Sequence, residues 1–83
     1  MKIIREPLCP RNGRRVVVAR YSNITTQTAH DFMVMAAKAE ADRRNDIKSV
    51  AVTPDSLSGR STATLMDKRG RSVVRFVQAY PKG

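Results

Sequence analysis

Residues 24–46, with the sequence ITTQTAHDFMVMAAKAEADRRND, decide the fold of this chain because their local signals all indicate a helix. Phe32, Met33 and Ala36 recur at helical spacing, Ala29 precedes them, and further alanines widen the apolar face. Threonines crowd the start, where a side-chain oxygen accepts a hydrogen bond from an unpaired N–H group of the first turn. The stretch therefore predicts a helix of about four to five turns.

A helix of this size cannot bury its own apolar face, so the flanking segments must cover it. Its alanines allow it to lie close to a flat partner, and the flanks supply a sheet. β-Branched and aromatic residues predict strands at residues 2–5, 16–21, 47–52, 61–67 and 72–80. The predicted fold class is α+β, with one helix packed on one face of a mainly antiparallel sheet of four to five strands, in the order β-(β)-α-β-β-β.

Turn residues and strand composition refine this layout. Asn12 and Gly13 predict a tight turn before the second strand, because both residue types tolerate positive φ. Gly70 is placed for the left-handed residue of the next hairpin loop. The three valines at residues 16–18 predict a central strand with both faces at least partly covered. Pro7, by contrast, predicts that the strand before it ends early at an irregular edge.

The strand nearest the C-terminus indicates which face of the sheet the helix covers. Val74 and Phe76 share one face of this strand, whereas Val73 and Arg75 share the other. One helix covers only one face of such a sheet, so the other face meets solvent, a second subunit or a ligand. We expect Arg20 and Arg75 to collect on that open face.

Composition indicates a single small domain, residues 1–83, with a modest core. No apolar run approaches the roughly 18 residues of a membrane span, and the N-terminus lacks the apolar region of a secretory signal. A lone cysteine, Cys9, excludes an internal disulfide framework and suits a reducing cytosol. We therefore expect a cytoplasmic protein with no membrane partner.

Charge is the outstanding global property of the chain. Sixteen Lys and Arg residues against seven Asp and Glu residues give a net charge of +9, and eleven of the sixteen are arginine. Residues 31–46 hold three basic and four acidic residues, whereas the rest of the chain holds thirteen basic and three acidic ones. The positive excess therefore lies in the strands and turns and not in the helix, which favours an anionic partner.

Basic residues surround both predicted turns, and others stand beside the second hairpin and on the open sheet face. The candidate partner-binding residues are Arg11, Arg14, Arg15, Arg20, Arg60, Lys68, Arg69, Arg71 and Arg75. Basic hairpin tips can follow a phosphate backbone, and each neutralised phosphate strengthens binding through counterion release. The expected partner is a nucleoprotein complex or a nucleic acid backbone. A basic surface without a partner, and a homodimer through the open sheet face, are the alternatives.

The sequence contains no motif for catalysis, cofactor binding or metal binding. His30 has no second histidine or cysteine cluster to act with and is expected at the surface. Cys9 lacks a nearby base and is expected to be a small, partly buried apolar residue. A phosphate-cradling glycine loop, a nucleophile elbow and a helix-turn-helix pair are all missing from the sequence. We expect no catalytic or metal-binding residue, no cofactor, no small-molecule substrate and no enzymatic activity.

The segments TTQTAHDFMVMAAKAEA, SVAVT, STATLMD and SVVRFVQAY follow the strand at residues 16–21 and give a strand–helix–three-strand layout. This layout and the chain length resemble small phage-encoded anti-CRISPR proteins, which are compact, non-catalytic α+β inhibitors of type I CRISPR surveillance complexes. The resemblance implies binding to a CRISPR RNA–protein complex in the host cytoplasm. It also implies that basic side chains occupy a surface meant for DNA or pair with acidic protein patches.

The leading hypothesis is therefore a phage anti-CRISPR-like inhibitor that docks on a nucleoprotein complex through its basic turns. The alternative is a DNA- or RNA-binding accessory or regulatory protein that contacts phosphates directly. A third hypothesis is an enzyme subunit or structural dimer that uses the open sheet face.

Overall fold

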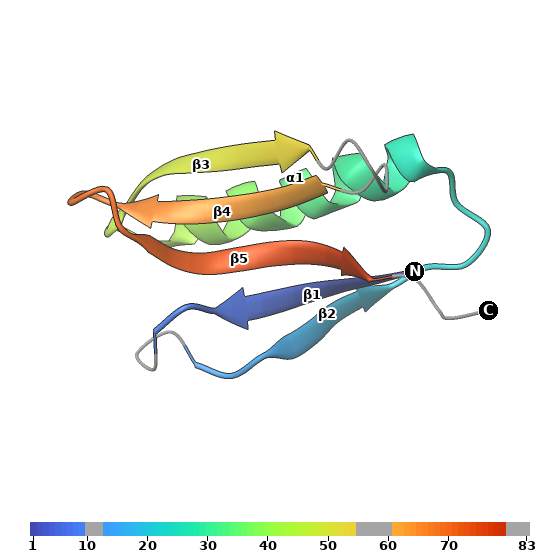
Figure 1. Cartoon of the computed structure of the whole chain (residues 1–83), viewed down its shortest axis with the longest axis horizontal. Coiled ribbons are helices and arrows are strands. Elements are labelled where there is room, and N and C mark those ends of the chain that lie inside the picture. Colours follow the sequence, from blue (N-terminus) through green and yellow to red (C-terminus); the bar gives the residue numbers. More distant parts are fainter. Residues whose placement is uncertain (10–12, 55–60, 80–83) are drawn as a thin grey trace.

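Figure 1 shows a helix lying across one face of a five-stranded sheet in the computed structural model, which describes residues 1–9, 13–54 and 61–79. The elements follow in the order β1 (Lys2–Pro7), β2 (Val16–Arg20), α1 (Thr26–Arg43), β3 (Ile47–Pro54), β4 (Ser61–Asp67) and β5 (Ser72–Ala79). The strands lie in the order β2-β1-β5-β4-β3, and each neighbouring pair is antiparallel. The predicted α+β class and element order are confirmed.

The helix α1 has 18 residues, about five turns as predicted, and a cap and a change of backbone conformation define its ends. Thr25 is extended, and its side chain accepts a hydrogen bond from the Thr28 N–H at 3.1 Å. At the other end Arg44 is extended, with φ −116° and ψ 137°, so the helix ends at Arg43. The threonine-rich start is therefore an N-cap, whereas residues 44–46 connect α1 to β3.

One line of residues on α1 faces the sheet. Ala29, Met33 and Ala37 are buried, and Glu40 continues the line with only 8% of its surface exposed. These residues are three or four positions apart and so lie on one face of the helix. The buried carboxylate of Glu40 is unexpected at this position and leads to the ion pairs described below.

The buried face of α1 is rotated from the predicted one. The spacing predicts that Phe32, Met33 and Ala36 face the sheet, but Phe32 and Ala36 are only partly buried beside the core. The Phe32 ring instead stacks on Tyr21, with the ring centroids 4.7 Å apart and the planes at 27°. The small residues of the buried line allow the helix to approach the sheet closely, and the bulkier Phe32 lies to one side.

The alternation of buried residues on β5 follows the prediction with one exception. Leu65 on β4 and Val74 and Phe76 on β5 are buried in the core cluster on the helix side. Val73 was expected on the opposite face but belongs to the same cluster. The register shifts between Leu65 and Met66, which makes Val73 the extra residue of a β-bulge. The bulge therefore brings an additional valine into the core.

Two predictions about strand position are wrong. β2 lies at an edge of the sheet, and β1 lies between β2 and β5. Val16 and Val18 on β2 are accordingly 48% and 44% exposed. Pro7 is the terminal residue of β1 and does not prevent the preceding residues from pairing on both sides. A high valine content indicates that a segment suits a β-strand. It does not indicate whether that strand has one neighbour or two in the sheet.

Both glycines expected in turns have positive φ, which favours glycine over other residues. The φ angle is +94° at Gly13 and +82° at Gly70. The Gly70 N–H donates a hydrogen bond to the Asp67 carbonyl at 3.0 Å and closes the β4–β5 turn as predicted. Asn12, the other half of the first predicted turn, lies outside the described residues.

Replacing the fully buried Met33 with alanine should lower the free energy of unfolding by about 2–5 kcal/mol, because it leaves a cavity between α1 and the sheet. Met35→Ala is the matched control, since Met35 is 63% exposed on the same helix. The control should change stability by less than about 0.5 kcal/mol. Urea titration measures both values. Equal losses in the two variants would contradict this orientation of α1.

Candidate anion-binding surface

Strand pairing places both basic turns at the same end of the molecule. β1 and β5 are antiparallel neighbours, and Pro7 at the end of β1 pairs with Val74 near the start of β5. The connection that leaves β1 and the turn that enters β5 are therefore at the same end, on the left in Figure 1. β3 also begins there, because Ile47 pairs with Asp67. The C-terminal end of α1, which leads into β3, consequently lies at the same end of the molecule as the two turns.

Exposed cationic side chains reach this end from three segments: the residues before β2, the last turn of α1 and the β4–β5 turn. We define the basic end as Arg14, Arg15, Arg43, Lys68, Arg69 and Arg71. Within the described residues none of these six forms an ion pair with a carboxylate. Lys68 acts electrostatically on the nearby Asp46, and the charges of the five arginines are available to an external anion. Arg43 was not among the predicted site residues, because helix charges balance in the sequence.

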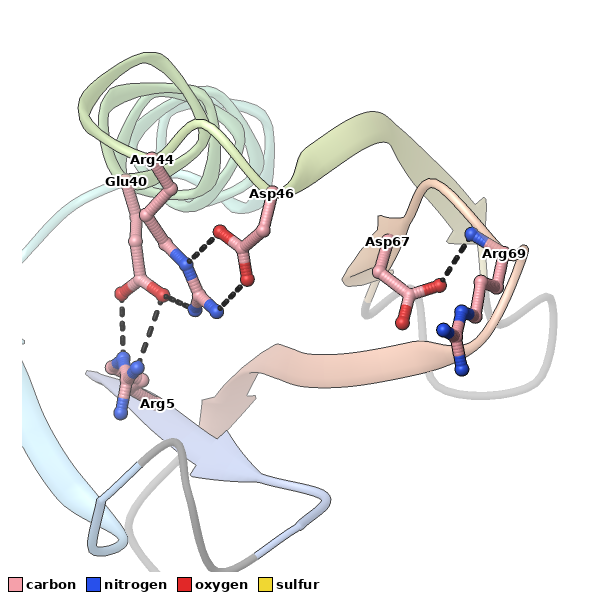
Figure 2. Close-up of polar contacts among 6 residues, drawn as sticks. All are labelled: Arg5, Glu40, Arg44, Asp46, Asp67 and Arg69. Atoms are coloured by element: carbon pink, nitrogen blue, oxygen red, sulfur yellow. Dashed lines mark hydrogen bonds and ion pairs between the residues drawn. The ribbon is translucent and has the colours of Figure 1, made fainter.

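A single carboxylate fixes the backbone of the β4–β5 turn. Asp67 Oδ1 accepts hydrogen bonds from the N–H groups of Arg69 and Arg71, each at 2.9 Å. The Asp67 N–H in turn donates to the Arg71 carbonyl at 2.9 Å. Figure 2 shows the Arg69 side chain extending from this turn while its backbone N–H binds Asp67. The turn therefore holds its cations on an ordered backbone.

A second group of charges, the ion-pair network, joins β1, α1 and the connection to β3. It consists of Arg5, Glu40, Arg44 and Asp46 (Figure 2). Glu40 accepts from Arg5 Nε at 2.5 Å and Nη2 at 3.0 Å, and from Arg44 Nη1 at 3.1 Å. Arg44 also donates to both oxygens of Asp46, at 3.0 and 2.7 Å. Two cations and two carboxylates balance one another, so this network adds no net charge to the basic end.

The network keeps its members ionised. Burial raises the pKa of Glu40, but hydrogen bonds from Arg5 and Arg44 outweigh this effect and leave the pKa below its ordinary value. The hydrogen bond with Asp46 raises the pKa of Arg44. The same bond lowers the pKa of Asp46. The α1–β3 connection and β1 are thus held together by full charges at neutral pH.

A cavity of about 680 Å³ lies at the basic end. Arg69 and Arg71 line it together with Cys9, and the carboxylates of Asp46 and Asp67 are also in its lining. Cys9 is partly buried, as the sequence predicts. The mixture of charges in this cavity does not favour an enclosed anion, so the exposed cations around it form the better candidate surface.

The predicted site residues fall into separate places. The basic end contains five of them, namely Arg14, Arg15, Lys68, Arg69 and Arg71. Arg20 is exposed at the other end of β2, where it pairs in register with Lys2. Arg75 lies on the open face of the sheet, and its Nη2 is 3.1 Å from Glu6 Oε2. Arg11 and Arg60 lie outside the described residues.

His30 has a partner that the sequence did not indicate and is partly buried rather than at the surface. Its Nδ1 lies 2.7 Å from Ser61 Oγ, and this contact joins α1 to the start of β4. Ser61 is 7% exposed, and its N–H donates to Gln78 Oε1 at 3.1 Å. A nucleophilic serine site also requires a group that orients the histidine. Among the described residues no carboxylate is hydrogen-bonded to His30, and the contact joins α1 to β4.

The described part of the chain holds no group of three or more His, Cys, Asp or Glu side chains arranged for a metal ion. In the same residues no helix is long and apolar enough to cross a membrane. Comparison with known protein families, curated protein sequences and solved structures finds no match for this chain. Its function must therefore be inferred from geometry and charge.

Glu40→Gln should lower the free energy of unfolding at neutral pH by about 1–3 kcal/mol, because Arg5 and Arg44 lose the charge that they share. The folded pKa of Glu40 lies below its ordinary value of 4.5, so its contribution is complete above pH 4.5 and is lost as the pH falls through the folded pKa. The difference between variant and parent should therefore shrink below pH 4.5.

Urea titrations above and below that pH measure this difference. Asp31→Asn serves as the control, because Asp31 is exposed on α1 and accepts only a hydrogen bond from Gln27 among the described contacts. A difference for Glu40→Gln that stays constant with pH would show that the side chain acts through packing and not through its charge.

Proposed function

We propose that this chain is a small non-enzymatic binding protein whose basic end contacts the anionic surface of a nucleoprotein complex. The observation that supports the proposal is the presence of six exposed cations on three segments at one end of the fold. Five of the six are arginines, and a planar guanidinium binds a phosphate through two N–H donors.

The basic end is ordered before it meets a partner, which favours tight binding. Asp67 holds the β4–β5 turn, and the ion-pair network holds the segment that follows Arg43. Binding through ordered segments loses less conformational entropy than binding through a flexible tail. The net charge of +9 also attracts an anionic partner over distance, most strongly at low salt.

Apolar side chains beside the basic end favour a nucleoprotein complex over bare nucleic acid. Leu8 follows β1 and is 43% exposed, and Val16 follows Arg15 and is 48% exposed. A phosphate backbone alone would not bury these apolar side chains, whereas a protein surface next to the phosphates would bury them. Direct contact with DNA or RNA as an accessory protein is the second candidate, because the same cations would serve it.

The specific target that we propose is a type I CRISPR surveillance complex. The support is the strand–helix–three-strand layout that resembles small phage-encoded inhibitors of these complexes. In this role the basic end would pair with RNA phosphates or with acidic protein patches, and the bound protein would obstruct access of DNA. The site of action would be the cytoplasm of an infected host cell.

The charge-reversed variant Arg14→Glu/Arg69→Glu/Arg71→Glu tests the basic end. It should weaken binding to a random duplex DNA, and to a reconstituted type I surveillance complex, by more than about tenfold at low salt. Fluorescence anisotropy at about 50 and 200 mM salt measures the affinity and its salt dependence. Stability should change by less than about 0.5 kcal/mol, because the three side chains are exposed.

Lys2→Glu/Arg20→Glu/Lys38→Glu is the control for duplex binding. It changes the net charge by the same amount, but Lys2 and Arg20 are exposed at the opposite end of the β1–β2 pair, and Lys38 is exposed on α1 outside the six residues of the basic end. It should change duplex affinity by less than about threefold. A preference for the complex over the duplex supports the leading target, and equal affinities support the accessory protein. A folded triple variant that binds both probes like the parent would refute the role of the basic end.

His30→Ala tests whether the His30–Ser61 contact takes part in function. The variant should lose about 1 kcal/mol of stability, because the buried Ser61 hydroxyl loses its partner. Its affinity for duplex DNA should stay within about threefold of the parent, because His30 does not belong to the basic end. A well-folded variant that loses binding would instead show that His30 takes part in the function.

A further inference from the structure

β2 has the composition of a central strand but lies at the edge of the sheet. An edge strand presents backbone N–H and C=O groups on its outer side, and proteins usually protect such a strand with charges or cover it. The first three residues of β2, Val16, Val17 and Val18, carry no charge. Val16 and Val18 are nearly half exposed. β2 therefore has the features of a strand that can receive another strand.

A groove of about 810 Å³ lies beside β2 on the helix side of the sheet. Val18, Ala36, Ala39 and Phe76 form its apolar lining, and charged residues of the ion-pair network are also part of it. The groove exists because α1 packs on β3, β4 and β5 and leaves the β1–β2 hairpin largely uncovered. A bulge in β2 makes Val18 an extra residue and bends the strand beside this groove.

A second groove, of about 460 Å³, lies on the open face of the same hairpin. Lys2, Arg15 and Arg20 are in its lining, together with the apolar side chains of Ile4 and Val17. Among the described residues that form this groove there is no carboxylate. β2 is thus flanked by a partly apolar groove on one face of the sheet and by a cationic groove on the other.

We propose that β2 binds an extended segment of a partner protein in which apolar and acidic side chains alternate, and that this segment adds to the sheet as a sixth strand. Successive side chains of a strand point to opposite faces. The apolar side chains would lie beside Val18, which lines the helix-side groove, and beside Val16, which pairs with Arg5. The acidic side chains would face Lys2, Arg15 and Arg20. Backbone hydrogen bonds give such strand addition its affinity, and the flanking grooves give it specificity.

Charge disfavours a second copy of this chain in the same place. Antiparallel pairing of β2 with itself would bring Arg15 and Arg20 close to the same cations of the other copy. Each copy also carries a net charge of +9. A nucleic acid strand would find cations in both grooves but would leave the exposed valines of β2 uncovered. An acidic–apolar peptide satisfies both faces.

Two labelled peptides of equal length test the proposal: one alternates Glu and Val between glycines, and the other alternates Lys and Val. The parent should bind the Glu/Val peptide at least about tenfold more tightly than the Lys/Val peptide. Lys2→Glu/Arg20→Glu should reverse this preference, because it places acidic side chains in the open-face groove. Lys48→Glu, on the other edge strand β3, is the matched control and should keep the parent's preference.

The apolar half of the proposal is tested by Val18→Glu. This variant should weaken binding of the Glu/Val peptide by at least about tenfold. Val52→Glu is its matched control, because Val52 is 39% exposed on β3. Circular dichroism verifies the folding of every variant. Amide chemical-shift changes in the parent on titration provide a measurement independent of the variants, and the largest should fall on β1 and β2.

The two grooves beside β2 share Arg15 and Arg43 with the basic end but contain none of Arg14, Arg69 and Arg71. The variant Arg14→Glu/Arg69→Glu/Arg71→Glu leaves Lys2, Arg20 and Val18 unchanged. It should therefore still bind the Glu/Val peptide although its affinity for duplex DNA is reduced. The proposal would be overturned if the parent did not bind the Glu/Val peptide, or if the β3 control variants lost as much peptide affinity as the β2 variants. Amide chemical-shift changes centred on β3 would also overturn it. If the parent bound an oligothymidylate but not the peptide, and the Lys2→Glu/Arg20→Glu variant did not bind the oligothymidylate, the open-face groove would be assigned to nucleic acid. A dimer abolished by Val18→Glu would assign β2 to self-association.

Discussion

The antiparallel pairing of β1 with β5 is the constraint on which the rest of the structure depends. Its six residue pairs bring the N-terminal hairpin alongside the strand that lines the centre of the core. The pairing sets both basic turns at one end of the sheet. It also places Arg5 on the helix side opposite Phe76, from where it reaches Glu40 on α1. β1 has β5 on one side and β2 on the other. No described strand pairs with the outer side of β2, so β2 is an edge strand.

The helix is narrower than the sheet that it covers, and this mismatch shapes the surface. An α-helix is about 10–12 Å wide, whereas neighbouring strands are about 4.8 Å apart, so one helix covers two or three strands. α1 accordingly packs on β3, β4 and β5. The β1–β2 hairpin is joined to α1 by the ion pair between Arg5 and Glu40, by the packing of Ile3 in the core cluster and by the stacking of Tyr21 on Phe32. A buried ion pair contributes less stability than apolar packing of the same area but fixes geometry, so the hairpin keeps its position while the groove beside α1 stays open.

Features that depend on neighbouring residues could be predicted from the sequence, and features that depend on strand pairing could not. Thr25 and Gly70 act within a few residues of their partners, so the helix start and the β4–β5 turn were predictable. The valines of β2 indicate a strand but not its place in the sheet. The contacts of His30 with Ser61 and of Arg5 with Glu40 join residues 31 and 35 positions apart, and no local pattern signals them. The contribution of Arg43 to the basic end depends on the same pairing.

The basic surface results as much from where the fold uses its acidic residues as from the number of its arginines. Glu6, Glu40 and Asp46 are ion-paired to arginines, and Asp67 binds the N–H groups of its own turn. Carboxylates held in this way stabilise strand and helix positions and do not neutralise the exposed cations. Solubility alone would be served by cations spread evenly over the surface. Their concentration at one end, on backbone ordered by those carboxylates, is the arrangement that a directional contact with an anionic partner requires.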